Sequence, residues 1–485
     1  TVAANSGVPS DSRKNMEYRE VGRRRAACIA AGACDPGAVD FVRFDRLLAL
    51  IPEHTWGLDT TFYLDVSQPG TLAKPFDADY DDWSNAQLQA ALSQQRKNYM
   101  LTIESWQEQR SYIANAIGNL DSKGPHAALR EELTGALEAL APRQLAAARA
   151  QKLRTGGGFV AVPSTGTMHC AKHGASIRFA SDGSIGSLSF DGRPIVSDES
   201  GGGRLGQTRY QTLSEDSFTR FDELYTGNCL GSNESALENI GCHNFAKPNM
   251  SSAYGGDRSA GDGVFSPTLS RLWRDAESCS FVTEAAFEPS LYTLRKPRAV
   301  DHLSFFLNPH NKRAAGGAPR KVFTSVSIVG AGVVEVNVSQ VNKTATRLAE
   351  ALWVSFKPSG TKAAGWRLRY YGTTDVAPTD VVEHGAVHLH ALPGDGSLVY
   401  DGGDGVRCEI ESLDVPVVSA GLLSPLPTAE DNTTRDNTTS LIESWIDSPT
   451  TGGWHWNLQN NIWNTNYPQW FREFSGAFRL TVAAT

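Results

Sequence analysis

The segment Glu53-His54-Thr55-Trp56-Gly57-Leu58-Asp59 places two carboxylates, an imidazole and an indole within seven residues. This composition is typical of a metal site in which His54 is the ligand and Glu53 or Asp59 orients it. A catalytic zinc takes about three protein ligands, so the remaining ligands would have to come from elsewhere. The alternative is a helix C-terminus, where His54 bonds the last carbonyl groups and Trp56 packs.

A second dense segment, 452–470, carries four tryptophans and five asparagines. Amide groups pair with sugar hydroxyls, and flat aromatic rings cover the apolar faces of pyranoses. The segment is therefore typical of a carbohydrate-binding site. The equally weighted alternative is an ordered β-sandwich segment whose tryptophans fill a core.

The remaining candidates for chemistry are histidines. His388 and His390 alternate on one face of an expected strand, which favours a surface or structural role. His169 and His173 flank Cys170 and would form a metal site only with further ligands. The sequence contains no nucleotide-binding glycine fingerprint, P-loop, HExxH motif or G-x-S-x-G elbow.

The elements that must position these residues change in type along the chain. The first 150 residues or so show helical periodicity, with a long amphipathic stripe at steps of three, four or seven residues after Ser84. Gly124-Pro125 ends this stripe, and a second helix follows, carrying Leu129, Leu133, Leu137 and Leu140. Segments 14–31 and 39–51 are expected to complete a helical bundle.

Beyond the glycines 156–158 the sequence consists of short alternating runs separated by Gly, Asp, Asn and Pro, with examples at 176–179, 324–329, 333–338 and 386–390. We therefore predict an α+β multidomain fold. A helical bundle domain spans residues 1–152, and a large antiparallel β-sandwich region, with room for two units, spans residues 153–485.

Composition limits the classes of partner. The net charge of −8 and the lack of a basic stripe exclude a nucleic-acid binder, and no apolar run is long enough to span a bilayer. Six sequons favour a secreted or luminal glycoprotein, and the expected glycosylation sites are Asn233, Asn249, Asn337, Asn342, Asn432 and Asn437.

The seven cysteines form no zinc-finger or CxxC pattern. Close spacing makes two disulfides plausible in an oxidising compartment, Cys28–Cys34 and Cys229–Cys242. The alternative is a set of buried small apolar residues in a reducing compartment.

Several motifs, taken together and in this order, resemble one family. They are 53–59, Glu104-Ser105-Trp106-Gln107-Glu108-Gln109-Arg110, 346–353, 412–418 and 460–470. The chain resembles an uncharacterised (domain-of-unknown-function) family related to the glycoside hydrolase family 38 α-mannosidases. The resemblance covers nearly the whole chain. Asn464 departs from the family pattern, which has a glycine there, and this changes the backbone freedom of the candidate sugar-binding loop.

This resemblance implies a β/α-barrel catalytic domain N-terminal to the helical bundle and β-sandwich. The barrel would carry the nucleophile, so no catalytic residue is assigned to this chain. His54 matches a histidine that helps to bind Zn²⁺ at a site shared with the barrel. The implied substrate-binding residues are Glu53, Trp56, Asp59, Asn460, Asn461, Trp463, Asn466 and Tyr467.

We expect the chain to be the C-terminal portion of a glycoside hydrolase-like, α-mannosidase-like protein. Its expected partners are carbohydrate and an N-terminal catalytic domain or chain, and we expect it to be inactive alone. The alternative is a non-catalytic extracellular glycoprotein that uses the same scaffold for carbohydrate binding or assembly.

Overall fold

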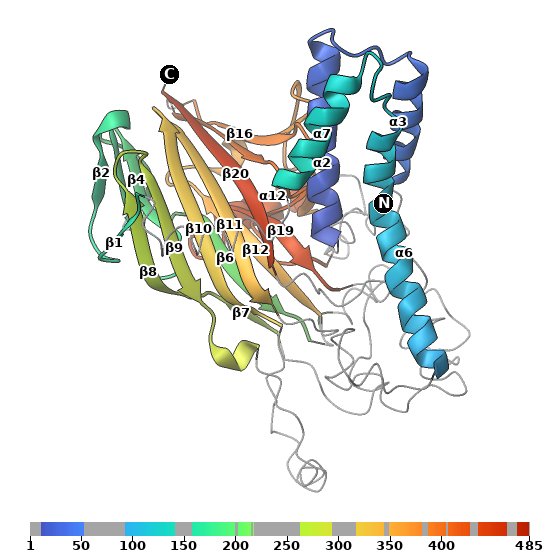
Figure 1. The fold of residues 1–485 in the computed structure, drawn as a ribbon. Helices are drawn as coiled ribbons and strands as arrows, with labels where there is room; N and C mark the ends of the chain where they lie inside the picture. The colour runs from blue at the N-terminus through green and yellow to red at the C-terminus, as the bar shows by residue number, and fades with distance from the viewer. Residues whose placement is uncertain are drawn as a thin grey trace, which may run out of the picture.

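Two antiparallel β-sheets of ten strands each dominate the computed structural model (Figure 1). The structure describes residues 11–52, 93–140, 158–198, 202–214, 217, 262–292, 317–343, 349–380, 387–403, 406–426, 435–462 and 473–484. The two sheets contribute side chains to one large hydrophobic core, so they form a β-sandwich.

The first sheet has the strand order β1-β8-β9-β10-β11-β20-β17-β16-β13-β14. Its strands are β1 (Val160–Val162), β8 (Thr268–Asp275), β9 (Ser280–Ala286), β10 (Pro319–Gly330), β11 (Val333–Lys343), β13 (Trp366–Tyr370), β14 (Thr374–Val376), β16 (Ser397–Asp401), β17 (Val406–Ser412) and β20 (Glu473–Ala484). The C-terminal strand β20 pairs with β11 on one side and β17 on the other. Strand β20 therefore lies inside the sheet and joins its two halves.

The second sheet has the order β15-β18-β19-β12-β6-β4-β3-β2, with β5 paired to β4 and β7 paired to β6. Its strands are β2 (Met168–Cys170), β3 (Ala175–Phe179), β4 (Ile185–Phe190), β5 (Arg193–Ser197), β6 (Arg204–Thr212), β7 (Gly263–Phe265), β12 (Glu350–Lys357), β15 (Leu389–Ala391), β18 (Val417–Ala420) and β19 (Trp454–Asn460). Three single-turn helices, η3 (Ala171–His173), η4 (Pro289–Leu291) and η5 (Ala363–Gly365), lie between strands.

Alternation of side chains builds the shared core. In β11, Val334, Val336 and Val338 are buried and belong to the core, whereas the residues between them are only half-buried. Successive side chains of a strand point to opposite faces, so this pattern turns one face of β11 inward. The strands expected at 176–179, 324–329 and 333–338 are present within β3, β10 and β11.

The described part of the chain also contains five α-helices. They are α2 (Ser12–Ala30), α3 (Val39–Leu50), α6 (Ser93–Gly118), α7 (Ala127–Ala139) and α12 (Arg435–Asp447). The first four share a small core that includes Phe41, Phe44, Ile113, Ile117 and Leu133. Asp11 is the N-cap residue of helix α2, and its side chain accepts a hydrogen bond from Lys14 N–H and so satisfies one of the unpaired amides of the first turn.

The predicted fold class, α+β with a helical bundle first, is wrong. The described chain is mostly antiparallel β, and the N-terminal helices are attached to the sandwich. Met16 of α2 belongs to the sandwich core, and Ser12 Oγ donates to the carbonyl of Leu458 on β19 at 2.8 Å. Helical periodicity indicates each helix separately, but it does not show that one face of α2 packs against sheets far along the chain. The predicted domain boundary after residue 152 lies outside the described residues.

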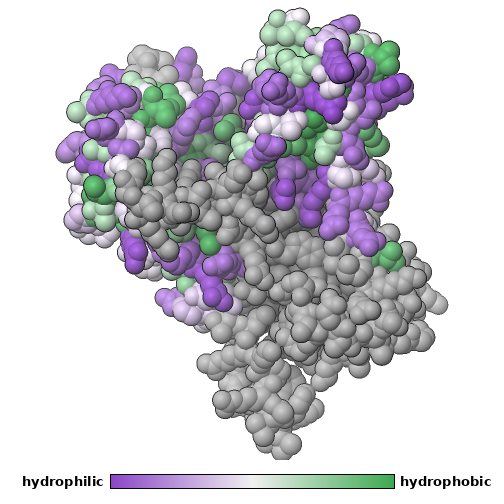
Figure 2. Space-filling model, in the orientation of Figure 1, coloured by the Kyte–Doolittle hydropathy of each residue, from purple (hydrophilic) through white to green (hydrophobic). Residues whose placement is uncertain are grey.

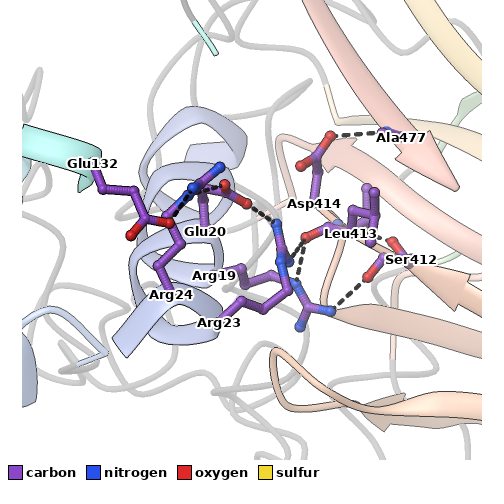
Figure 3. A network of polar contacts seen from close by, with 10 residues as sticks. Arg19, Glu20, Arg23, Arg24, Glu132, Ser412, Leu413, Asp414 and Ala477 are labelled. Atoms are coloured by element: carbon purple, nitrogen blue, oxygen red, sulfur yellow. Dashed lines mark hydrogen bonds and ion pairs between the residues drawn. The ribbon is translucent and has the colours of Figure 1, made fainter. Parts of the chain in front are cut away.

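A buried arginine forms the centre of this junction (Figure 3). The Arg19 guanidinium donates to the carbonyls of Leu392 and Ser412 at 2.7 Å each and to that of Leu413 at 3.3 Å. Burial lowers the pKa of Arg19 to about 10, so the side chain stays charged at neutral pH. Arg23, one turn on, also donates to the Leu413 carbonyl and pairs with Glu20.

On the face shown in Figure 2, the helices and the sandwich form two lobes whose described surface is largely hydrophilic. Isolated exposed apolar side chains such as Val39 and Val160 are normal for a protein surface. Among the described helices, none has the length and apolar character needed to cross a membrane.

Candidate functional site

Strand β19 is buried on both of its faces. Trp454 and Trp456 belong to the core between the sheets, so these two tryptophans fill the sandwich rather than a sugar pocket. His455 points the other way: its Nδ1 is 2.8 Å from Ser355 Oγ and its Nε2 is 2.9 Å from the Thr451 carbonyl oxygen. The outer face of the sheet is therefore polar at this strand and still closed to solvent.

Amide side chains gather on this outer face where β6, β12 and β19 lie side by side. Trp353 Nε1 donates to Gln211 Oε1 at 2.8 Å, and Gln211 Nε2 donates to the Leu423 carbonyl at 2.8 Å. Asn460 Nδ2 donates to Asn457 Oδ1 at 2.7 Å. The strand register brings Gln211, Ala351 and Asn460 together across three neighbouring strands. We call Gln211, Trp353, Asn457 and Asn460 the amide face.

A buried ion pair lies at the same end of these strands, on the side of the core. Lys343 Nζ pairs with Glu350 Oε1, and each side chain is only 2% exposed. Tyr210 OH donates to Glu350 Oε2 at 2.5 Å and accepts from Gly317 N–H at 2.8 Å. Burial and the neighbouring Glu350 charge raise the pKa of Tyr210 well above its usual value, so its hydroxyl remains a neutral donor.

Two glutamines extend this buried polar region between the sheets. Gln459 Nε2 donates to Gln340 Oε1 at 2.9 Å, and Gln340 Nε2 lies 3.3 Å from Gln459 Oε1. Gln340 belongs to one sheet and Gln459 to the other. Because an unpaired polar group in a core is costly, this reciprocal pairing fixes how the two sheets meet here.

The amide face and the ion pair are joined through the first residue of β12. The main-chain carbonyl of Glu350 accepts from Asn461 N–H at 2.9 Å, and the next residue, Ala351, pairs with Asn460. The site thus combines several neutral donors and acceptors with one buried carboxylate. Amides of this kind can pair with hydroxyl groups, and in this structure they are buried and pair with one another or with the main chain.

Sequence reasoning singled out only part of this site. Asn460 and Asn461 are described and almost fully buried at the end of β19. The other predicted substrate-binding residues lie outside the described residues, namely Glu53, Trp56, Asp59, Trp463, Asn466 and Tyr467, as does the predicted metal ligand His54. Sequence reasoning missed Tyr210, Lys343 and Glu350, since single polar residues in alternating strands give no local signal.

The histidines proposed as structural are buried. His388 Nε2 is 3.1 Å from the Ser424 carbonyl oxygen, and its ring packs edge-on against Trp445. Burial lowers the pKa of His388 to about 4 and that of His390 to about 4, so both are neutral at physiological pH. The structural interpretation holds for the pair, and neither lies on the surface.

Among the described residues, one cluster brings together three side chains of the types that bind metals. It consists of His173, Cys170 and Cys279. These two cysteines are joined in a disulfide, so neither offers a thiolate to a metal. This cross-link was not predicted, because its partners lie 109 residues apart. The expected Cys28–Cys34 disulfide is present, and Cys229 and Cys242 lie outside the described residues.

The predicted glycosylation sites differ in their exposure and in whether the structure describes them. Asn337 is half-buried within β11, and Asn342 is exposed near the end of that strand. Asn437 falls in α12, in a stretch whose side chains are not described. Asn233, Asn249 and Asn432 lie outside the described residues.

The solved structures that match this chain include two that are distant from it in sequence. The galactose 1-epimerase from Lactobacillus acidophilus NCFM is 12% identical, with a TM-score of 0.31 over 67% of this chain and 98% of that chain. A GalM/aldose epimerase homologue from C. elegans is 10% identical, with a TM-score of 0.26 over 66% of this chain and 99% of that chain. At these TM-scores neither likeness bears on function.

No curated protein matches the sequence. Residues 8–329 match the model of a family described as a domain of unknown function, DUF5054. The match covers well over half of the chain, including helices α2, α3, α6 and α7 and part of each sheet. The expectation of an uncharacterised family is thereby confirmed, and its relation to the α-mannosidases stays a prediction. The chain belongs to the DUF5054 family.

Proposed function

We propose that this chain is the carbohydrate-recognising portion of a glycoside hydrolase-like, α-mannosidase-like protein that works with a catalytic barrel domain lying outside this sequence. The observation that carries the proposal is the segment rich in amides and aromatic rings that continues from the buried amide face at the end of β19 through Asn461 to Trp463 and Tyr467.

The physical argument rests on the chemistry of sugars. The hydroxyl groups of a pyranose both donate and accept hydrogen bonds, and an amide side chain can also do both without carrying a charge. Indole and phenol rings suit the apolar faces of the sugar. The amide face leads along the chain through Asn461 into Trp463 and Tyr467, which supply such rings in the sequence.

The proposed metal ligand is His54, acting with ligands from the catalytic domain. Zinc bound there would polarise sugar hydroxyls and stabilise developing charge. Elemental analysis of the wild-type protein with its catalytic partner, and of His54→Ala, tests this. Zinc occupancy should fall sharply in the variant, and unchanged occupancy would exclude His54 as a ligand.

Binding of methyl α-mannoside, followed by a wider glycan screen, tests the proposed recognition. We expect Asn461→Ala and Trp463→Ala to weaken binding about tenfold or more, equivalent to about 1.4 kcal/mol. Asn115→Ala is the matched control, because Asn115 is an exposed helix residue whose amide contacts Ser111. If no glycan binds the wild-type chain, the proposal fails.

Hydrolysis separates this proposal from a purely binding glycoprotein. The chain co-purified with a barrel-bearing partner should cleave an aryl α-mannoside, and the chain alone should not. Glycan binding without hydrolysis by the complex would favour a non-catalytic extracellular glycoprotein that uses the scaffold for recognition.

A further inference from the structure

The ion pair between Lys343 and Glu350 is unusual for its position. Lys343 is the last residue of β11 in one sheet, and Glu350 is the first residue of β12 in the other. Both side chains are buried, so the pair joins the two sheets inside the protein. In contrast, the Lys321–Glu284 pair of the same sandwich, at 2.6 Å, leaves its lysine half exposed.

Stability alone gives a poor reason for this pair. Removing two charges from water costs several kcal/mol per ion, and apolar residues of similar volume are often as stable or more stable. A buried pair is better explained when it selects one packing arrangement of the strands among several that a purely apolar core would allow. The Tyr210 hydroxyl adds to this constraint, because it holds the second oxygen of Glu350 and is itself held by Gly317 N–H.

The main chain around Glu350 shows what the pair would fix. Asn461 N–H donates to the Glu350 carbonyl at 2.9 Å, and Leu213 N–H donates to the Ala349 carbonyl at 3.2 Å. Asn460, a member of the amide face, pairs with the adjacent Ala351. Two strand ends, those of β6 and β19, are thus held at the point where the Glu350 side chain is locked.

We propose that Glu350 is a positioning residue for the candidate carbohydrate site, and that its buried pairing with Lys343 sets the conformation of Asn460 and Asn461. This inference rests on the proposed function for its biological meaning. Its structural content is independent, because it predicts which amides lose protection when the pair is replaced.

The decisive variant replaces both charges at once. Lys343→Met with Glu350→Gln removes the ion pair without leaving a buried charge, and the glutamine oxygen can still accept from Tyr210. Lys321→Met with Glu284→Gln is the control, because it removes a more exposed pair of the same type from the same sandwich. Each protein is compared with wild type in thermal unfolding, amide hydrogen exchange and binding of methyl α-mannoside.

We expect the Lys343/Glu350 double variant to unfold cooperatively near the wild-type temperature. Exchange at Asn461 should rise at least tenfold and mannoside binding should weaken at least tenfold, whereas the control should change neither. Wild-type exchange at Asn461 in the double variant would overturn the inference. Failure of the double variant to fold would also overturn it, since the pair would then serve stability. If wild type binds no glycan, the proposed function fails and the exchange result still decides the role of Glu350.

Discussion

Asp414 shows how much a single residue depends on its surroundings. It lies just after β17 beside helix α2, where its Oδ2 accepts from Ala477 N–H at 2.8 Å (Figure 3). Burial raises the pKa of Asp414 to about 6, and the Ala477 hydrogen bond, Arg23 and Arg19 only partly oppose that effect. The carboxyl group therefore keeps its proton up to a higher pH in the folded protein than in the unfolded chain.

The sign of the pH effect follows from this pKa. The folded state binds the proton more tightly than the unfolded state, so the stabilisation is complete at low pH and is lost as pH rises through about 6. When the pH is raised from 4.5 to 7.5, we expect the free energy of unfolding of Asp414→Asn to increase by about 2 kcal/mol relative to that of wild type. Urea unfolding at both pH values measures this, with the exposed Asp401→Asn as control. A stability difference that does not change with pH would contradict the assignment.

The two sequons of strand β11 differ in the exposure of their asparagines. Asn337 pairs with Ser325 and Ala477 inside the sheet, and its Oδ1 accepts from Ser339 Oγ at 3.2 Å. Asn342 is exposed and adopts a φ of 56° near the end of the strand. An attached glycan needs accessible space, so we expect Asn342 to be occupied and Asn337 to be unmodified in secreted material.

Intact-mass spectrometry before and after glycan removal tests this preference. Asn342→Gln should remove the mass of one glycan, and Asn337→Gln should leave the mass pattern unchanged. Loss of a glycan from the Asn337 variant would show that the sheet does not protect this site.

At the scale of elements, helix α2 is attached by Arg19. We expect Arg19→Met to destabilise the protein by about 3 kcal/mol, because three buried carbonyls lose a charged donor. Arg13→Met, which removes only a surface pair with Glu17, should change stability by about 0.5 kcal/mol or less. Chemical denaturation measures both. Equal effects would mean that α2 is not held through Arg19.

Element prediction from the sequence worked where the signal was local. The Leu129, Leu133 and Leu137 stripe corresponds to α7, and alternation at 333–338 corresponds to β11. The fold class failed because packing is not local. Met16 looks like one more apolar helix residue, and only the folded chain places it in the sandwich core.

At the scale of the whole molecule, the Cys170–Cys279 disulfide links the two sheets. Cys170 ends β2 in one sheet, and Cys279 lies in the turn between β8 and β9 of the other. It closes a loop of 109 residues, whereas Cys28 and Cys34 are only 6 apart. Closing a longer loop removes more freedom from the unfolded chain.

We therefore expect the two disulfides to differ in their contribution. Replacing Cys170 and Cys279 by serine should lower the free energy of unfolding by about 4 kcal/mol. Replacing Cys28 and Cys34 by serine should lower it by about 2 kcal/mol. Denaturant unfolding under non-reducing conditions measures each loss. A larger loss for the Cys28–Cys34 pair would show that loop length does not decide the order.

The sequence by itself determined the local features: the helices, the strands, the near-neighbour disulfide and the amide-rich character of β19. Each depends on residues close together in the chain, so periodicity and spacing report it directly. Only the tertiary structure decided that antiparallel sheets dominate and that α2 packs on them. It alone also brought Tyr210, Lys343, Glu350 and Asn461 to one end of the sandwich. Strand pairing joins residues more than a hundred positions apart, and no local pattern records which strands will pair.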